Sequence, residues 1–219
     1  MIIRDDKKTE PLRTSGVDEH DVELTRMDLV YDGFNRVFRY NFRVKGYDGS
    51  WSSKMDREVF KRLDAVAVLP YDPVRDRIVL IEQFRVGAYA AGEHYRQLEP
   101  IAGLMDSDEL IEEIARRETL EECGCEVRSL TPMLRYLVSP GCASETVHCF
   151  LGTIDSDNVG GLHGCADEGE DIRVHVLDVD DAFRELRENR HTFGLTVICL
   201  QWLQLNIERL RKAALDDAG

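Results

Sequence analysis

A helix that carries acids where it should carry apolar side chains is the feature of this sequence that could do chemistry. At 100° per residue, Glu118 and Glu122 fall on the face that begins with Ile111 and Ala115, and Glu121 falls on its flank. Carboxylates four residues apart repel each other, and acids in the last turns also meet the negative end of the helix dipole. An acidic face exposed to solvent is the alternative. However, these acids continue the stripe of Ile111 and Ala115, which is expected to face the core. Their spacing therefore favours a divalent-cation site with oxygen ligands.

The predicted helix spans residues 107–123, and both ends have sequence signals. Asp106 is a good N-cap, and Glu109 stands three residues later, as in a capping box. Gly124 is a typical C-terminal stop. On the same projection, the outer face of the helix holds Glu112, Glu113, Arg116 and Cys123.

The composition predicts a globular chain of one or two domains that binds neither nucleic acid nor an anionic membrane. The chain has 219 residues, with 28 Lys and Arg against 42 Asp and Glu, and its net charge is −14. The electrostatic field of a negatively charged protein repels polyanions such as nucleic acids and anionic membranes. An anionic small-molecule substrate requires cations between it and the carboxylates, which agrees with a metal site.

We expect a cytoplasmic protein with reduced cysteines. The segment MIIRDDKKTEPLR lacks an apolar signal-peptide core, and the apolar stretches 65–69 and 195–200 are too short to span a bilayer. The six cysteines contain no C-x-x-C pair. A zinc cluster is an alternative, although its spacing fits no standard template. Its candidate ligands are Cys142, His148, Cys149, His163 and Cys165.

The elements that must position the acidic helix are predicted to be strands and helices in a layered α/β core. β-Branched and aromatic residues predict strands within 21–47 and a third around 51–60. Three strands bury little apolar surface on their own, so they must pack against the rest of the chain or against a second subunit. Further strands are predicted at 65–69, 78–82, 134–139, 146–154 and 172–179. Helices are predicted at 182–190 and 195–212.

The residues around the acidic helix follow a known pattern. Seven residues have a fixed spacing here: Gly103, Glu109, Arg117, Glu118, Glu121, Glu122 and Gly124. In all seven the chain resembles the Nudix hydrolases, whose box reads G-x5-E-x7-R-E-U-x-E-E-x-G-U, with U a bulky aliphatic residue. Thr119 and Cys125 depart from the pattern at the U positions, which affects packing and not chemistry.

Segments outside the box are similar to the bacterial ADP-ribose pyrophosphatase branch of that family. These segments are 72–85, 137–145, 161–176 and 200–205, and Pro140 lies fifteen residues after the box. The resemblance implies an α/β/α Nudix sandwich at residues 59–219 and a small N-terminal β-strand dimerisation domain at residues 1–58. It also implies a homodimer in which the N-terminal domain is swapped between subunits.

The resemblance implies Mg²⁺ as the cofactor, in two or three ions, with Mn²⁺ as a substitute. The ligands would be Glu118, Glu122, Glu170 and the backbone carbonyl of Ala102, with Glu121 as a helper.

The resemblance also places the general base at Glu168. This residue lies in the acidic run 166–171, where Asp167, Glu170 and Asp171 are the other candidates and an ordinary surface loop is the alternative. Glu109 and Arg117 would form a structural pair that orients the metal carboxylates.

Substrate contacts are expected from three parts of the chain. Arg85 ends a predicted strand and is a candidate for a phosphate or base contact, with a rim ion pair as the alternative. Ribose recognition is expected from Leu104, Ser139, Pro140, Gly141 and Glu145. From the other subunit, Phe34, Asn35 and Arg57 are candidates for binding adenine, with strand packing as the alternative for the aromatic ring.

These residues predict Mg²⁺-dependent hydrolysis of ADP-ribose to AMP and ribose 5-phosphate. Another nucleoside diphosphate sugar, such as GDP-mannose or UDP-glucose, is the first alternative, because the box concerns only the pyrophosphate and the metals. An inactive Nudix-like nucleotide-binding module and an acidic structural protein without metal are the others. The presence of all the acids disfavours the inactive module.

Overall fold

The computed structural model describes residues 19–165 and 169–217. These residues belong to two compact units. One unit runs to Arg62 and includes Gly141–Ala143, and the other contains Leu63–Pro140 and the residues from Ser144 onward.

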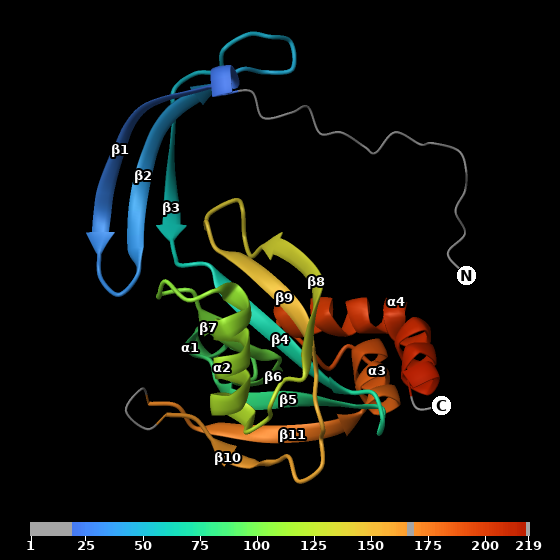
Figure 1. Cartoon of the computed structure of the whole chain (residues 1–219). Coiled ribbons are helices and arrows are strands. Elements are labelled where there is room, and N and C mark those ends of the chain that lie inside the picture. The colour runs from blue at the N-terminus through green and yellow to red at the C-terminus, as the bar shows by residue number, and fades with distance from the viewer. Residues whose placement is uncertain (1–18, 166–168, 218–219) are drawn as a thin grey trace, which may run out of the picture. The chain divides into compact units, whose positions relative to one another are not determined.

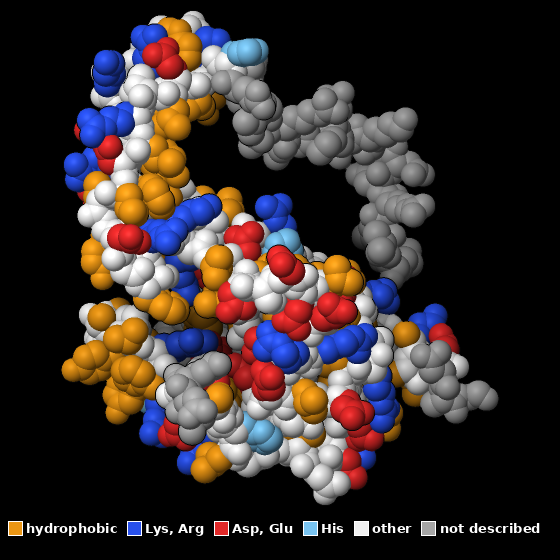
Figure 2. Space-filling model, turned by 60° about the vertical axis from the view of Figure 1, so that its left-hand side comes forward, with side chains coloured by type: hydrophobic (Ala, Val, Ile, Leu, Met, Phe, Trp, Pro, Cys, Tyr) orange, Lys and Arg blue, Asp and Glu red, His pale blue; other side chains and the backbone are white. Residues whose placement is uncertain are grey.

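The N-terminal unit is a small antiparallel sheet. A short 3-10 helix, η1 (Glu19–Asp21), leads into β1 (Val22–Asp32), β2 (Arg36–Val44) and β3 (Met55–Lys61), which pair in the order β1-β2-β3 (Figure 1). Ion pairs join neighbouring strands, such as Arg43 with Glu23 at 2.6 Å. Hydrophobic side chains run along this sheet among charged ones (Figure 2), and Leu24, Met27 and Tyr31 are at least half exposed. The three strands therefore have little core of their own.

The second unit is built on one mixed sheet. Its strands are β4 (Ala65–Asp72), β5 (Arg77–Phe84), β6 (Arg96–Glu99), β7 (Ile101–Leu104), β8 (Ser129–Leu137), β9 (Thr146–Thr153), β10 (Gly161–His163) and β11 (Ile172–Asp178). The main order is β10-β11-β5-β4-β9-β8. Strands β4 and β5 pair over only two positions and then separate, so that β7 pairs with β4 and β6 with β5. The pairing of β4 with β9 is parallel.

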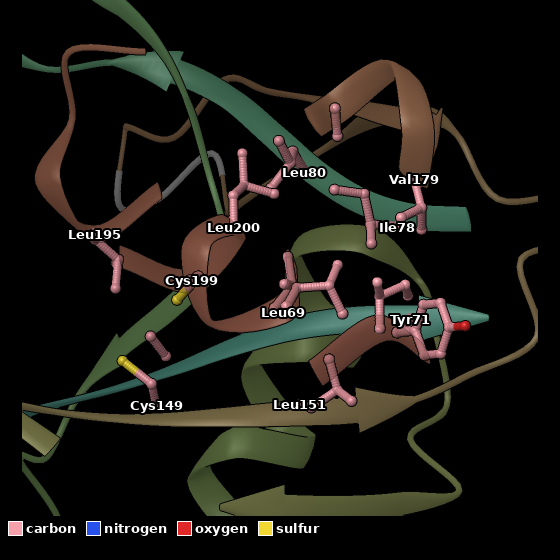
Figure 3. Packing of buried hydrophobic residues seen from close by; sticks show 14 of the residues in the cluster. Leu69, Tyr71, Ile78, Leu80, Cys149, Leu151, Val179, Leu195, Cys199 and Leu200 are labelled. Atoms are coloured by element: carbon pink, nitrogen blue, oxygen red, sulfur yellow. The ribbon is translucent and has the colours of Figure 1, made fainter. Parts of the chain in front are cut away.

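Helices cover both faces of this sheet. Helix α2 (Ile111–Cys123) packs on one face, and α3 (Val179–Arg187) and α4 (Gly194–Asp217) pack on the other; a short helix, α1 (Val86–Ala90), follows β5 (Figure 1). Every residue of β4 is buried because both faces are covered. Leu69 and Tyr71 pack with residues of α3 and α4 (Figure 3), whereas Val66 and Val68 pack with α2. The result is a mixed α/β sandwich, as predicted.

The predicted strands and helices of this unit are present, with shifted ends. The short elements α1, β6, β7 and β10 were not predicted from the sequence. Within the described part of the chain, no helix is long and apolar enough to cross a bilayer.

Three details of the predicted acidic helix are wrong. The helix begins at Ile111 rather than 107, and its N-cap is Leu110, whose backbone N–H donates to the Glu113 carboxylate at 3.0 Å. Asp106 is therefore not the cap. Cys123, predicted on the outer face, is only 2% exposed. The helix does end at Gly124, which has a φ of 70° in the left-handed region that glycine tolerates.

Candidate active site

The acids of α2 lie against the sheet, as the predicted stripe requires. Glu122 is 4% exposed and the Glu118 side chain is 16% exposed, whereas the Glu121 side chain is 57% exposed. The two inward acids follow Ile114 and Ala115, which are fully buried in the core on the same face of the sheet. The first turns of α2 therefore pack on the sheet with apolar side chains, and the last turns place carboxylates on the same buried face of the helix.

Strand β7 lies next to these carboxylates. The backbone N–H of Ala102 donates to Glu122 Oε2 at 3.2 Å, and a Cβ at Gly103 would overlap the Glu118 side chain. Ala102 is opposite Ala67 of β4 in an antiparallel pair. In such a pair the N–H and C=O of one residue point to the same side. Because the N–H of Ala102 points to Glu122, its carbonyl also points away from β4 and is free to bind a cation.

Burial makes these carboxylates costly to ionise in the absence of a cation. It raises the pKa of Glu122 to about 8, against a hydrogen bond from Ala102 that lowers it, and the charges of Glu118 and Glu170 raise it further. Burial also raises the pKa of Glu118, and Arg117 partly offsets that effect. A cation at this position would remove the penalty, since it favours the charged form of every neighbouring carboxylate.

Arg117 joins Glu118 and Glu121 of α2 to the loop before the helix. Its guanidinium lies 3.0 Å from both Glu118 Oε1 and Glu121 Oε2 and 3.4 Å from Glu109 Oε2. Burial lowers the pKa of Arg117, but the neighbouring carboxylates outweigh it and raise the pKa above its usual range. A hydrogen bond from Ser107 lowers the pKa of Glu109. Arg117 thus stays charged and fixes the side of Glu118 that faces it.

Glu170, in the downstream loop, lies near enough to α2 for its charge to raise the pKa of Glu118 and of Glu122. The Glu170 carboxylate accepts from the Cys165 N–H at 3.3 Å, and the Glu170 N–H donates to the Cys165 carbonyl at 3.1 Å. Gly164, with a φ of 98°, allows this close approach, because a Cβ there would overlap Glu170. The predicted base Glu168 and its neighbour Asp167 lie outside the described residues.

A cavity of about 320 Å³ lies at the ends of β5 and β11. Arg85 and Glu170 both line it, together with Glu82, Gln83, Phe84, Arg96, Leu162, Gly169, Asp171 and Arg173. The cavity therefore has three arginines and three acids in its lining, one of which is a predicted metal ligand. The arginines could bind phosphate oxygens, whereas the acids would need a cation between them and an anionic molecule.

Other predicted substrate residues lie elsewhere in the same unit. Leu104 ends β7 opposite Ala65. Ser139 follows β8, and Pro140 begins the turn at residues 140–142. Glu145 is 7% exposed and lies just before β9, where its carbonyl accepts from the Val138 N–H at 3.1 Å.

The remaining predicted substrate residues belong to the N-terminal unit. Phe34 is 93% exposed in the turn between β1 and β2, where Asn35 is its neighbour. Arg57 lies on β3 opposite Tyr40. Gly141 is also grouped with this unit. Their assignment to substrate binding stays a prediction.

One buried charge of this region was missed from the sequence. Glu99, at the end of β6, is fully buried and forms a bidentate ion pair with Arg85. The signal available was a single acid within the apolar segment 98–101, three residues before Ala102. A single acid in a strand is a common pattern. It does not predict a buried ion pair unless its partner, here Arg85, is known.

The donor set fits a hard divalent cation, because it consists of carboxylate oxygens and one carbonyl oxygen. Among the described residues, no three His, Cys, Asp or Glu side chains already converge on one point. Glu118 faces Arg117, Glu122 accepts from Ala102, and Glu170 accepts from Cys165. Each of these contacts uses one oxygen of its carboxylate. Binding one cation between the three carboxylates requires the side chains to turn towards a common point.

Comparison with known proteins gives a consistent result. A family model described as the NUDIX domain matches residues 61–196. The ADP-ribose pyrophosphatase of Escherichia coli (strain K12) is 42% identical over 193 residues, which cover 88% of this chain and 92% of that protein. The Haemophilus influenzae protein of the same name is 39% identical over 198 residues, covering 89% and 91% of the two chains.

More distant relatives share the fold. A GDP-mannose pyrophosphatase of Shigella flexneri is 36% identical over 186 residues, covering 84% of this chain and 96% of that protein. A crystal structure of an ADP compounds hydrolase superposes with a TM-score of 0.62 at 20% sequence identity, covering 84% of this chain and 95% of the other. At that identity, the likeness shows the fold alone.

Proposed function

The chain belongs to the Nudix family, and on that premise we propose that it hydrolyses the pyrophosphate of ADP-ribose to AMP and ribose 5-phosphate. The observation that carries the reaction type is the contact of β7 with the buried acids of α2, through Ala102 with Glu122 and Gly103 with Glu118. The near full-length similarity to proteins named ADP-ribose pyrophosphatase supports the substrate.

Nudix hydrolases use divalent metal ions, generally Mg²⁺. We assign the ligands to Glu118, Glu122, Glu170 and the carbonyl of Ala102, with Glu121 as a helper on the exposed flank. Two or three ions would be held here, and Mn²⁺ would substitute. When bound, Mg²⁺ neutralises charge on the pyrophosphate and lowers the pKa of a bound water.

The other roles belong to side chains of the chain itself. Glu168 accepts the proton of the attacking water, as a carboxylate that is not fully used as a ligand. Arg117 holds Glu118 and Glu121 through ion pairs at 3.0 Å, and Glu109 holds Arg117 from the loop before α2. The Glu109–Arg117 pair thus limits how far these two carboxylates turn when a cation is bound.

Substrate binding is assigned to both units. Arg85 binds a phosphate oxygen in the cavity that Glu170 also lines. The contacts to the terminal ribose come from Leu104, Ser139, Pro140, Gly141 and Glu145. Adenine would be held by Phe34, Asn35 and Arg57 of a second protomer, in a homodimer with swapped N-terminal domains. The poorly buried sheet of the N-terminal unit supports such a partner.

We keep the division into a dimerisation domain at residues 1–58 and a hydrolase domain at residues 59–219 as part of this proposal. We also place the reaction in the cytoplasm, with no nucleic-acid or membrane partner. No disulfide joins any of the six cysteines, all of which lie in the described part of the chain, and this is consistent with a reducing compartment.

Hydrolysis of GDP-mannose is the second candidate, because a GDP-mannose pyrophosphatase also matches most of the chain. A panel of ADP-ribose, GDP-mannose and UDP-glucose, incubated with Mg²⁺ and analysed for products, separates the two. AMP and ribose 5-phosphate formed at the highest kcat/KM support the first proposal. A higher kcat/KM for GDP-mannose supports the second, and no product from any of them would indicate an inactive module.

A further inference from the structure

We propose that Glu99 is a positioning residue, which holds the Arg85 guanidinium so that one edge of it faces the substrate. The proposal rests on the proposed function only in taking Arg85 as a phosphate contact. Glu99 lies outside the Nudix box and outside the predicted ligand set. It acts through Arg85 and touches neither the metal nor the substrate.

The geometry of the pair is specific. Arg85 Nε donates to Glu99 Oε1 at 2.9 Å, and Arg85 Nη2 donates to Glu99 Oε2 at 3.0 Å. This bidentate arrangement uses one edge of the planar guanidinium and fixes its orientation. No described residue accepts a hydrogen bond from the Nη1 group or from the second hydrogen of Nη2, so both can bind another acceptor.

The two side chains differ in exposure in a way that shows which edge is available. The Glu99 side chain is 0% exposed, whereas the Arg85 side chain is 42% exposed and lines the cavity with Glu170. The edge of Arg85 that is bound to Glu99 is therefore buried, and the free edge is on the side of the cavity. A phosphate group bound in this cavity would meet that free edge.

Strand pairing makes the pair rigid. Glu99 is paired with Ile81 of β5, three positions before the strand end at Phe84 that leads to Arg85. The Arg85 N–H donates to the Tyr95 carbonyl at 2.7 Å. The pairing of β5 with β6 therefore holds the backbones of Glu99 and Arg85 close together. A guanidinium that is fixed before the substrate arrives loses less entropy on binding than a free one.

Stability alone does not account for a buried pair of this kind. Removing two charges from water costs about as much as their attraction returns, and apolar replacements of similar volume are often neutral or stabilising. A purely structural position at the edge of this core would be filled as well by an apolar side chain. The presence of an acid here is explained by the orientation that it imposes on Arg85.

The test is a double-mutant cycle on kcat/KM with the full-length protein. Glu99→Gln keeps the size of the side chain but accepts only one of the two N–H groups. We expect it to lower kcat/KM about tenfold to a hundredfold, mainly through KM, because one charge-assisted contact to the substrate loses its orientation. In an Arg85→Lys background, which has no guanidinium to orient, the same change should alter kcat/KM by less than about twofold.

Two controls make the result specific. Asp178→Asn breaks another arginine–carboxylate pair of this sheet, Asp178 with Arg77 at 2.9 Å, and should leave kcat/KM unchanged. The Mg²⁺ concentration for half-maximal activity should be the same in Glu99→Gln and in the wild type. Thermal denaturation of each variant checks that the fold is retained.

The proposal is overturned if Glu99→Gln leaves KM unchanged in a folded protein, or if its effect is the same in the Arg85→Lys background. A large rise in the Mg²⁺ requirement would also overturn it, because Glu99 would then be a metal ligand. The cycle is run with whichever nucleotide sugar the wild type hydrolyses best. Failure to cleave ADP-ribose therefore counts against the proposed function and not against the role of Glu99.

Discussion

Replacing Glu122 with Gln should separate the cost of a buried carboxylate from its benefit as a metal ligand. In the metal-free protein, the pKa of Glu122 is raised from 4.5 to about 8, first because it is buried. A raised pKa in the folded state stabilises the protein below the unfolded pKa, and this stabilisation is lost as the pH rises through 8. The metal-free wild type should thus weaken between about pH 5.5 and pH 8.

The size of this effect follows from the shift. With pKa values of 4.5 unfolded and about 8 folded, Glu122 removes about 3 kcal/mol from the free energy of unfolding between about pH 5.5 and pH 8. For a chain of this length, that corresponds to about 6–12 °C in Tm. Glu122→Gln has no charge to bury, so its Tm should lack this component. The isolated contribution of Glu122 is the difference between the two pH profiles.

The assay is thermal unfolding with a chelator and then with Mg²⁺. Mg²⁺ at about a hundred times its Kd should add about 2.7 kcal/mol to the wild type, and little to Glu122→Gln. Turnover of the variant should fall by at least about a hundredfold. Glu112→Gln makes the same charge change on the predicted outer face of α2 and is the matched control.

Identical pH profiles for wild type and Glu122→Gln would refute the reasoning about burial. Full stabilisation of the variant by Mg²⁺, with wild-type turnover, would refute the assignment of Glu122 as a ligand. The two conclusions are independent, because the first needs no metal and the second needs no pH change.

Three further changes test other parts of the site. Glu168→Gln should keep the Mg²⁺-dependent rise in Tm but lower kcat by orders of magnitude, and a loss of Mg²⁺ affinity would instead make Glu168 a ligand. Gly103→Ala should displace the Glu118 carboxylate, because the new Cβ would overlap it. We expect kcat to fall by at least about tenfold with the fold retained. An unchanged kcat would show that β7 shifts to accommodate the methyl group. Phe34→Ala should raise KM for ADP-ribose several-fold without changing Tm, because its ring is 93% exposed. An unchanged KM would remove Phe34 from the adenine site.

The acidic stripe could be predicted because helical periodicity is a local property. Glu118 and Glu122 lie where the 100° projection from Ile111 puts them, and the glycine stop at Gly124 is also correct. The start of the helix was wrong because two capping signals compete. The structure uses Leu110 with Glu113, which leaves Glu109 free to reach Arg117.

The short strands and the Glu99–Arg85 pair could not be predicted, because both depend on non-local contacts. Strands β6 and β7 have four residues each, too few for a clear pattern, and they exist because β4 and β5 separate and leave edges to pair. Glu99 and Arg85 are fourteen residues apart and meet only after that pairing. Cys123 was misplaced because the true buried face of α2 is wider than the predicted stripe.

The orientation of the Ala102 backbone carbonyl has a consequence for how this site can evolve. If its carbonyl is a ligand, that ligand is encoded by strand register and not by any codon, so no substitution of the methyl side chain deletes it. A one-residue slip of β7 against β4 would turn the carbonyl to the opposite edge. Transplanting the glutamates of α2 onto another scaffold would thus carry over only part of the coordination sphere, and the neighbouring strand would have to be transferred with them.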